Sequence, residues 1–364
     1  MTLALLHGSR KPRPAPIGVG AASRLWVRQA VHVLSTQVAR LWKALIGFFR
    51  RRPIVEEVPL GTSPEELILR YDAASLQLSD ELATVRLAGV ATMSRLADDW
   101  PVERQQCIDV LCTYLRAAPR YATGFSESDI RNAIVATITA HLRDESELSW
   151  ARLDFDFTGA VLYDADFADV TFSGARTSFA RATFSGGVTR FARATFSGEV
   201  TRFDGATFSG GVARFDGATF SGAYTFFAGA AFAGWDTIFD GARFGGAYTV
   251  FDRATFSGWY TNFNLATFSS GYTGFDLVTF SAQKTGFEGA SFSGAVTRFD
   301  GATFCGKATS FDMARFTGKH TSFEGTTFSG ERPADEVTTR SSFDGSEVRW
   351  GPISPRPLPT TGVA

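Results

Sequence analysis

The cysteine and histidine side chains are the residues best suited to nucleophilic or metal chemistry, and their spacing favours neither. Cys107, Cys112 and Cys305 form no C-x-x-C pair, and an odd count of three does not indicate a disulfide framework. The four histidines lack the spacing of metal ligands: His7, His32, His141 and His320. We therefore expect no catalytic residue, metal or cofactor, and reduced thiols in a cytoplasmic protein.

A regular series of aspartates could bind metal ions. Its members are separated by multiples of twelve residues: Asp204, Asp216, Asp240, Asp252, Asp276, Asp300 and Asp312. The Gly-Asp nonapeptide pattern of calcium-binding repeats is missing, and arginines such as Arg202 and Arg214 lie nearby. We interpret these acids as solvated or hydrogen-bonded carboxylates with basic neighbours.

Aromatic residues recur every 24 residues in the middle of the second half. Tyr224, Tyr248 and Tyr272 form one such row, and Trp235 and Trp259 form another. Exposed aromatic rows mark contact surfaces. They could also cover insertions in a repeat or pair two copies in a homodimer. The candidate partner-binding residues are Tyr224, Phe226, Trp235, Tyr248, Trp259, Tyr260 and Tyr272.

The charge of the 364-residue chain changes abruptly along its length, although the net charge is only −1. Residues 1–55 contain ten Lys/Arg and no acid, whereas residues 56–149 contain eight basic and sixteen acidic residues. These changes predict a disordered basic tail (1–23), a cationic amphipathic helix (24–52) and a helical domain (60–148).

The basic helix has the composition of a helix that lies at a membrane surface. Arginines and a lysine would prevent it from spanning the hydrocarbon, while its apolar face carries tryptophan. The candidate membrane-contacting residues are Trp26, Arg28, Arg40, Trp42, Lys43, Arg50, Arg51 and Arg52. The alternatives are packing against the acidic helical domain and nucleic-acid binding, for which no motif is present. Of these three interpretations, we rank peripheral attachment to the inner membrane first.

Four amphipathic helices are expected in the helical domain. Ser63-Pro64-Glu65-Glu66 predicts the start of the first, with Ser63 as N-cap. The others are expected at about 80–98, 102–117 and 127–143, the last capped by Ser126. Leu69 and Leu76 are among the apolar positions of the first helix. Short connections indicate antiparallel packing.

A twelve-residue repeat runs from Phe167 for fourteen units and uses 28 of the 35 phenylalanines. A typical unit is FDGATFSGGVTR, Phe203–Arg214, with a second Phe five residues after the first. Each Phe is preceded by a small residue two positions earlier, so a five-residue word occurs twice per unit with two residues added. Gly follows the second Phe by two residues in twelve units, which is suited to a corner. Five-residue spacing does not maintain one face of an α-helix.

This pattern resembles the pentapeptide-repeat family, whose words read A(D/N)(L/F)xx. The resemblance covers about residues 151–347 and implies a right-handed, four-sided parallel β-helix, with each Phe and the small residue before it pointing inward. We expect this mainly β fold over 150–347, with 24 residues per coil, a helical cap at its start and a disordered Pro-rich tail at 348–364. The two added residues depart from the family pattern, and bulges at opposite corners would accommodate them.

The expected function is that of a non-catalytic scaffold or protein-binding module. Some pentapeptide-repeat proteins resemble duplex DNA to type II topoisomerases, so the resemblance also implies a gyrase modulator as an alternative. Residues 150–330 contain fourteen basic and sixteen acidic residues, which is far from the strongly negative surface that such mimicry requires. We therefore rank the binding module first.

Overall fold

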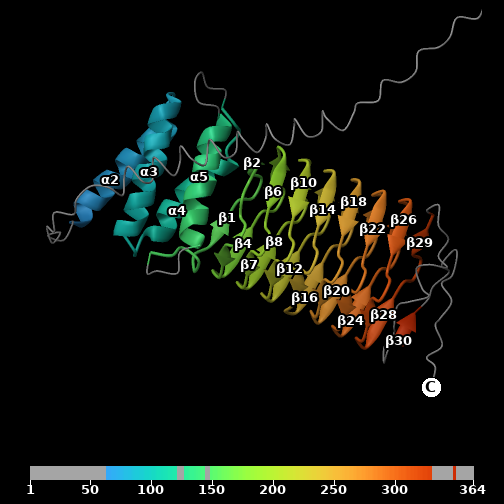
Figure 1. The fold of residues 1–364 in the computed structure, drawn as a ribbon. Helices are drawn as coiled ribbons and strands as arrows, with labels where there is room; N and C mark the ends of the chain where they lie inside the picture. The colour runs from blue at the N-terminus through green and yellow to red at the C-terminus, as the bar shows by residue number, and fades with distance from the viewer. Residues whose placement is uncertain (1–62, 121–126, 144–147, 330–346, 350–364) are drawn as a thin grey trace, which may run out of the picture. The chain divides into compact units, whose positions relative to one another are not determined.

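The computed structural model describes residues 63–120, 127–143, 148–329 and 347–349. Within them, four helices precede a stack of parallel β-coils (Figure 1). The predicted basic tail and amphipathic helix lie outside the described residues, as do Ser126 and most of the Pro-rich tail. The mainly β architecture with an α-helical N-terminal part is confirmed.

The described helices are α2 (Pro64–Ser79), α3 (Ala83–Asp99), α4 (Arg104–Arg116) and α5 (Glu127–Leu142). The predicted start of α2 is confirmed, because Ser63 Oγ accepts the N–H of Glu66 at 3.3 Å and proline occupies the first turn. The cap satisfies one of the amides that the first turn leaves without a helical partner.

The apolar side of α2 differs from the prediction. Leu69 and Leu76 are 68% and 75% exposed, whereas Leu67, Ala74 and Leu78 are buried. The helix has apolar residues on two sides, and periodicity alone does not show which side packs against α3. Leu69 and Leu76 therefore do not belong to the core.

Each coil passes through four parallel sheets in the order B, C, D, A, so sheets A and C lie on opposite sides of the solenoid. Pairing partners are 24 residues apart through most of the stack, as Tyr224↔Tyr248 illustrates. The first coil is shorter, since Phe155 pairs with Thr177 and Val161 with Thr183. It lacks one of the two-residue additions that later units carry.

The strands are two or three residues long. Sheet A contains β1 (Phe155–Asp156), β4 (Arg176–Ser178), β8 (Val200–Arg202), β12 (Tyr224–Phe226), β16 (Tyr248–Val250), β20 (Tyr272–Gly274), β24 (Val296–Arg298), β28 (His320–Ser322) and β30 (Glu347–Arg349). Sheet B contains β2 (Val161–Tyr163), β5 (Thr183–Ser185), β9 (Thr207–Phe208), β13 (Ala231–Phe232), β17 (Thr255–Phe256), β21 (Thr279–Phe280), β25 (Thr303–Phe304) and β29 (Thr327–Phe328). Sheet C contains β6 (Val188–Arg190), β10 (Val212–Arg214), β14 (Asp236–Ile238), β18 (Tyr260–Asn262), β22 (Lys284–Gly286) and β26 (Ala308–Ser310). Sheet D contains β3 (Thr171–Phe172), β7 (Thr195–Phe196), β11 (Thr219–Phe220), β15 (Arg243–Phe244), β19 (Thr267–Phe268), β23 (Ser291–Phe292) and β27 (Arg315–Phe316).

The two added residues of each unit are accommodated in bends that precede the strands of sheets A and C. We number a unit from its first Phe, so that Phe203 is position 1 and Arg214 is position 12. The bend falls at positions 8 and 9, and positions 10–12 form a three-residue strand. The opposite type of corner has a left-handed residue at position 3, such as Gly205 (φ 61°) or Leu277 (φ 57°).

The glycine at position 8 is explained mainly by close contact between coils. A Cβ on Gly222 would lie 1.8 Å from the carbonyl oxygen of Gly198 in the preceding coil. Among the described position-8 glycines, only Gly186 and Gly246 have positive φ. The expected conformational role therefore holds for those two glycines, and the steric role explains the others. Ser270 replaces this glycine in one unit, and its hydroxyl bonds the hydroxyl of Thr249 at 2.6 Å.

The interior of the solenoid is filled by phenylalanine columns. Phe203, Phe227 and Phe251 stack directly, with successive ring centroids 4.7 Å apart and interplanar angles of 1° and 2°. The predicted 24-residue stacking is confirmed. Since each coil contributes four phenylalanines, the two sequence ladders become four columns, and rings of neighbouring columns meet edge to face, as Phe239 and Phe251 do at 5.8 Å and 89°. These contacts link every coil to its neighbours.

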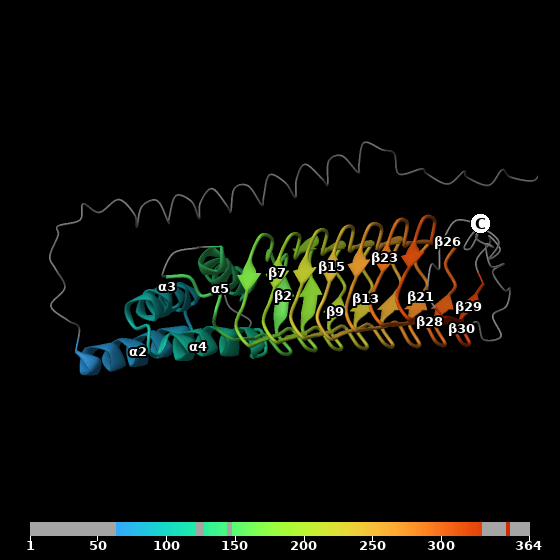
Figure 2. The same ribbon diagram turned by 90° about the horizontal axis from the view of Figure 1, so that it is seen from below.

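Helices α4 and α5 lie against the first coil of the stack (Figure 2). Arg131 donates to the carbonyl oxygen of Val161 at 3.3 Å, and Gln105 exchanges hydrogen bonds with the backbone of Asp154. Trp150 is completely buried between the last described helix and the first strand. A helical cap at the N-terminal end is therefore confirmed, and it shields the phenylalanine columns from water.

Candidate functional site

The seven aromatic residues predicted to bind a partner lie on two opposite sides of the solenoid. Four belong to strands of sheet A, namely Tyr224, Phe226, Tyr248 and Tyr272. The other three lie at or next to sheet C, namely Trp235, Trp259 and Tyr260. The predicted set therefore forms two surfaces and not one site.

The sheet A residues form a continuous aromatic surface, which we call the tyrosine stripe (Tyr224, Phe226, Tyr248 and Tyr272). Tyr224 and Tyr248 are stacked at 5.7 Å, and Tyr272 follows at 5.9 Å with a tilt of 42°. Phe226 lies beside Tyr224 at 6.1 Å. Tyr248, in the centre, is 46% exposed. Stacking holds these rings in place, so the stripe is ordered before any partner binds.

The tryptophans form a smaller surface at the corner between sheets B and C. Trp235 and Trp259 are 71% and 55% exposed, and the backbone N–H of Trp259 donates to the carbonyl oxygen of Trp235 at 2.6 Å. Tyr260 is turned toward Asn264, whose amide nitrogen donates to its hydroxyl at 3.4 Å. The corner thus exposes two indole rings, whereas the stripe has one exposed ring, that of Tyr248, within a run of four of which the other three are half-buried.

Carboxylates beside the stripe bind the backbone of the next coil. Asp252 Oδ1 accepts the N–H of Asp276, and Asp276 Oδ1 accepts the N–H of Asp300, both at 3.1 Å. Burial raises the pKa of Asp252 and of Asp276 above the usual range. Burial, with the neighbouring carboxylates, raises the pKa of Tyr272 to about 12. The expectation of hydrogen-bonded acids is confirmed here, and Arg298 is the basic neighbour of Asp276 at 3.3 Å.

The two cysteines of the helical region have the environment of core residues. Cys107 and Cys112 are buried in α4. Burial raises the pKa of Cys107 to about 11 and that of Cys112 to about 12. Both thiols are therefore protonated near neutral pH and are poor nucleophiles.

His141 joins the helices to the first coil. Its ring stacks on Trp150 at 3.9 Å, and its Nε2 lies 3.2 Å from Asp98 Oδ2. Trp150 Nε1 donates to the other oxygen of Asp98 at 3.2 Å, and Nδ1 of His141 lies 2.8 Å from the carbonyl oxygen of Thr137. Both ring nitrogens thus face oxygen atoms, and this His–Asp pair links α3, α5 and the segment that leads into the solenoid.

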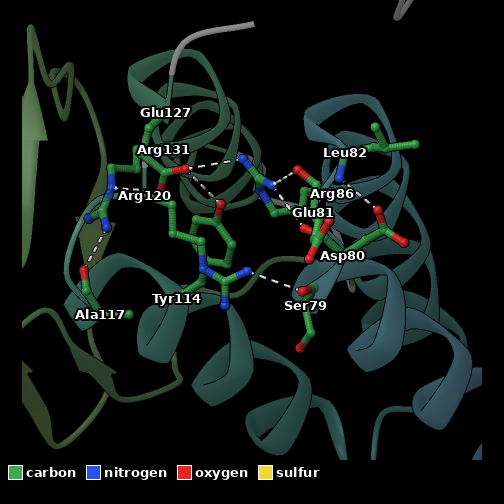
Figure 3. Close-up of polar contacts among 10 residues, drawn as sticks. All are labelled: Ser79, Asp80, Glu81, Leu82, Arg86, Tyr114, Ala117, Arg120, Glu127 and Arg131. Atoms are coloured by element: carbon green, nitrogen blue, oxygen red, sulfur yellow. Dashed lines mark hydrogen bonds and ion pairs between the residues drawn. The ribbon is translucent and has the colours of Figure 1, made fainter. Parts of the chain in front are cut away.

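A buried cluster of two arginines and one glutamate lies among the helices (Figure 3). Glu127 accepts from Arg131 Nε at 3.1 Å, from Tyr114 at 3.2 Å and from Arg86 at 3.4 Å. Arg86 also donates to the carbonyl oxygens of Asp80 and Glu81, both at 2.8 Å.

The cluster contains one more guanidinium than carboxylate, and helix ends compensate for it. Arg86 bonds the carbonyl oxygens of the connection between α2 and α3, and Arg131 donates to the carbonyl oxygens of Leu115 and Ala117 at the end of α4, at 2.7 and 2.6 Å. Helix C-termini carry partial negative charge, which stabilises a cation. The sequence analysis missed this cluster; arginines between apolar neighbours, as in Val85-Arg86-Leu87, were the available signal.

The predicted membrane-contacting residues all lie outside the described part of the chain. In the part that is described, no helix has both the length and the apolar character needed to cross a membrane. The same part contains no group of three or more His, Cys, Asp or Glu side chains arranged to hold a metal ion.

Comparison of the chain with protein-family models, with curated proteins and with solved structures found no match. The similarity to pentapeptide-repeat proteins therefore rests on the repeat itself and on the coil that it forms.

Proposed function

We propose that this protein is a non-catalytic β-solenoid of the pentapeptide-repeat type that binds a protein partner through the tyrosine stripe. The supporting observation is the run of four neighbouring aromatic rings on one sheet, centred on the exposed Tyr248. Aromatic residues are enriched at protein interfaces because they bury a large area at little cost in side-chain entropy.

The repeat itself indicates that the stripe is not required for folding. Tyr224, Tyr248 and Tyr272 share one row of sheet A with Val200 and Val296. A β-branched residue is therefore sufficient for the strand at this position. Tyrosine at three successive coils adds exposed aromatic area that the coil does not need.

A second proposal concerns residues 24–52. We propose that this basic amphipathic segment attaches the protein to an anionic membrane surface, which its sequence pattern supports. Gyrase modulation by DNA mimicry is less well supported, because acids such as Asp204 and Asp216 are paired with Arg202 and Arg214. Such pairing neutralises the charge that a phosphate-like surface would need.

Site-specific cross-linking tests the partner surface. The photoreactive residue p-benzoylphenylalanine replaces Tyr248 in the full chain, and Val200 serves as the matched position two coils away in the same row. We expect a cross-linked partner from position 248 that is absent from position 200. The triple substitution of Tyr224, Tyr248 and Tyr272 by valine should abolish co-purification of the same partner.

One outcome of this experiment would identify the partner as a second copy of the chain, and another would refute the proposed function. A cross-link between two copies of the chain would identify the stripe as a homodimer interface. Equal cross-linking from positions 248 and 200, together with unchanged co-purification by the triple valine variant, would refute the proposed function.

A further inference from the structure

Arginine and aspartate form a recurring ion pair on the outer surface of the repeat. In three units, an arginine at position 12 pairs with the aspartate two residues later, at position 2 of the next unit, whereas Ile238 and Ser310 precede Asp240 and Asp312 on sheet C. The Nε–Oδ distances are 2.7 Å for Arg202–Asp204 and 2.8 Å for Arg214–Asp216. Arg298 repeats this geometry with Asp300, at 3.0 Å from Nε and 2.7 Å from Nη2.

The tyrosine stripe interrupts this pairing. Val250 and Gly274 occupy position 12 of their units, although Asp252 and Asp276 still follow at position 2. Arg298, which pairs with Asp300 in the next coil, also lies 3.3 Å from Asp276 Oδ2 through its Nη2. Asp252 has no ion-pair partner among the described residues, and Arg253 and Arg298 act on it only at longer range. Among the described residues, Asp252 therefore lacks the position-12 guanidinium that Asp204 and Asp300 have beside the same sheet.

Because Gly274 has no side chain, the ring of Tyr272 and the carboxylate of Asp252 can approach each other. A Cβ at this position would lie 2.5 Å from Asp252 Oδ1 and 2.7 Å from Cε1 of Tyr272. The hydroxyl of Tyr272 donates to Asp276 at 3.5 Å, which holds the ring across the glycine. A carboxylate and an aromatic ring thus meet on one surface, next to the exposed ring of Tyr248.

We propose that the stripe accepts an arginine side chain of the protein partner, whose guanidinium pairs with Asp252 and stacks on the rings of Tyr248 and Tyr272. This inference rests on the proposed function and names the chemistry of the partner. Arginine fits better than lysine because its planar guanidinium stacks on aromatic faces and binds carboxylates through two N–H groups. The repeat itself uses arginine beside the same row of acids, at Arg202 and Arg298.

Burial makes this carboxylate receptive to a cation. Asp252 is already partly removed from water in the folded protein, which raises its pKa. An incoming guanidinium would therefore meet a poorly hydrated anion, and the attraction between them would be screened less than at an open surface. The adjacent aromatic rings bring apolar area to the same contact.

The test uses the full chain and a fluorescein-labelled peptide of alternating valine and arginine. An otherwise identical peptide carries citrulline, the uncharged isostere of arginine. We expect the arginine peptide to bind more tightly than the citrulline peptide, by roughly 10- to 100-fold for a lost charge-assisted contact. Asp252→Asn should weaken binding of the arginine peptide to a similar extent.

The variant Val250→Arg provides the sharpest test, because it supplies the missing guanidinium from within the chain. It should pair with Asp252 as Arg202 pairs with Asp204, and it should lose binding of the arginine peptide. Ser310→Arg is the matched control. It adds the same charge at position 12 and precedes Asp312, but it lies on sheet C, so binding should be retained.

The outcomes separate this inference from the proposed function. If the wild type does not bind the arginine peptide, or if Val250→Arg binds it as the wild type does, the arginine site is refuted. If both peptides bind equally and Tyr248→Val weakens both, the stripe is a binding surface without an arginine site. If Tyr248→Val, Asp252→Asn and Val250→Arg all bind as the wild type does, the peptide binds elsewhere and the arginine site is refuted, while the cross-linking experiment decides the proposed function separately.

Discussion

Removal of one ring from the centre of a phenylalanine column would test the interior directly. Phe251 is completely buried and stacks on Phe227 at 4.7 Å and on Phe275 at 4.9 Å. It also meets Phe239 and Phe263 edge to face, at 5.8 and 5.7 Å. Phe251→Ala would remove all of these ring contacts and leave a cavity enclosed on every side.

The expected loss of stability lies at the upper end of the usual range. Burial of a phenylalanine in a core contributes enough that Phe→Ala costs about 3–5 kcal/mol. Each aromatic pair adds roughly 0.5–1.5 kcal/mol beyond burial, and Phe251 has two stacked partners. Backbone hydrogen bonds to the neighbouring coils, such as Phe251 N–H to the carbonyl oxygen of Gly274 at 2.8 Å, prevent the cavity from collapsing. We therefore expect a loss of about 4–5 kcal/mol.

Denaturant unfolding of the full chain measures this loss, and Phe328→Ala serves as the comparison. Phe328 is only partly buried and stacks on Phe304, at 4.7 Å, at the end of its column. Its removal should cost about 1–2 kcal/mol. If Phe251→Ala costs less than about 1 kcal/mol, or no more than Phe328→Ala, the columns do not carry the stability assigned to them here.

Three further predictions concern the cap, the acids and the N-terminal segment. Glu127→Gln would leave the buried Arg86 and Arg131 without their shared carboxylate and should reduce the free energy of unfolding by about 3–5 kcal/mol. Amide hydrogen exchange in α5 should become faster. Unchanged protection would contradict a role for the cluster in stabilising the helical cap. The pKa of Asp252 is raised by burial from its ordinary value of 3.8, so the folded state retains this proton more tightly than the unfolded state. Stability should therefore fall as pH increases from that value through the raised pKa, and Asp252→Asn should reduce the slope of stability against pH measured by denaturant titration; an unchanged slope would argue against a desolvated carboxyl. Deletion of residues 1–55 should abolish co-sedimentation with anionic liposomes, and equal sedimentation of the deleted and intact chains would exclude the membrane attachment proposed for residues 24–52.

The coil could be predicted from the sequence because large, buried side chains recur at its period. Phe recurs every twelve residues with a second Phe five residues later, and only a structure that returns to the same side at that interval can bury all of them. The four helices of the described residues were predictable, but the packed side of α2 was not. Leu69 and Leu76 satisfy the helical period equally well, and the contacts with α3 determine which leucines are buried.

The candidate site could be predicted only in part. The 24-residue spacing placed Tyr224, Tyr248 and Tyr272 in one row, which the pairing of β12, β16 and β20 confirms. The spacing did not reveal the carboxylate of Asp252 beside them, because its environment depends on Gly274 one coil above and on the way the ring of Tyr272 lies across that glycine. Such contacts between coils follow from side-chain packing, which a linear pattern does not contain.

In a regular repeat, residues at equivalent sites of successive coils can be compared, which distinguishes the residues that the fold requires from those that it does not require. Two rows of sheet A show which residues the backbone tolerates. One row has Val200 and Val296 where the stripe has tyrosine. The other has Arg202 and Arg298, and the coils between them have Phe226, Val250 and Gly274. At the coils of the stripe, the first of these rows carries tyrosine, and the second carries no arginine, so Asp252 has no ion-pair partner among the described residues. Loss of stabilising partners for Asp252 gives the coil no benefit in folding, since a buried carboxyl without a cation is unfavourable. The two departures become favourable together if a partner supplies the cation, which is why they point to one binding surface and not to two unrelated substitutions.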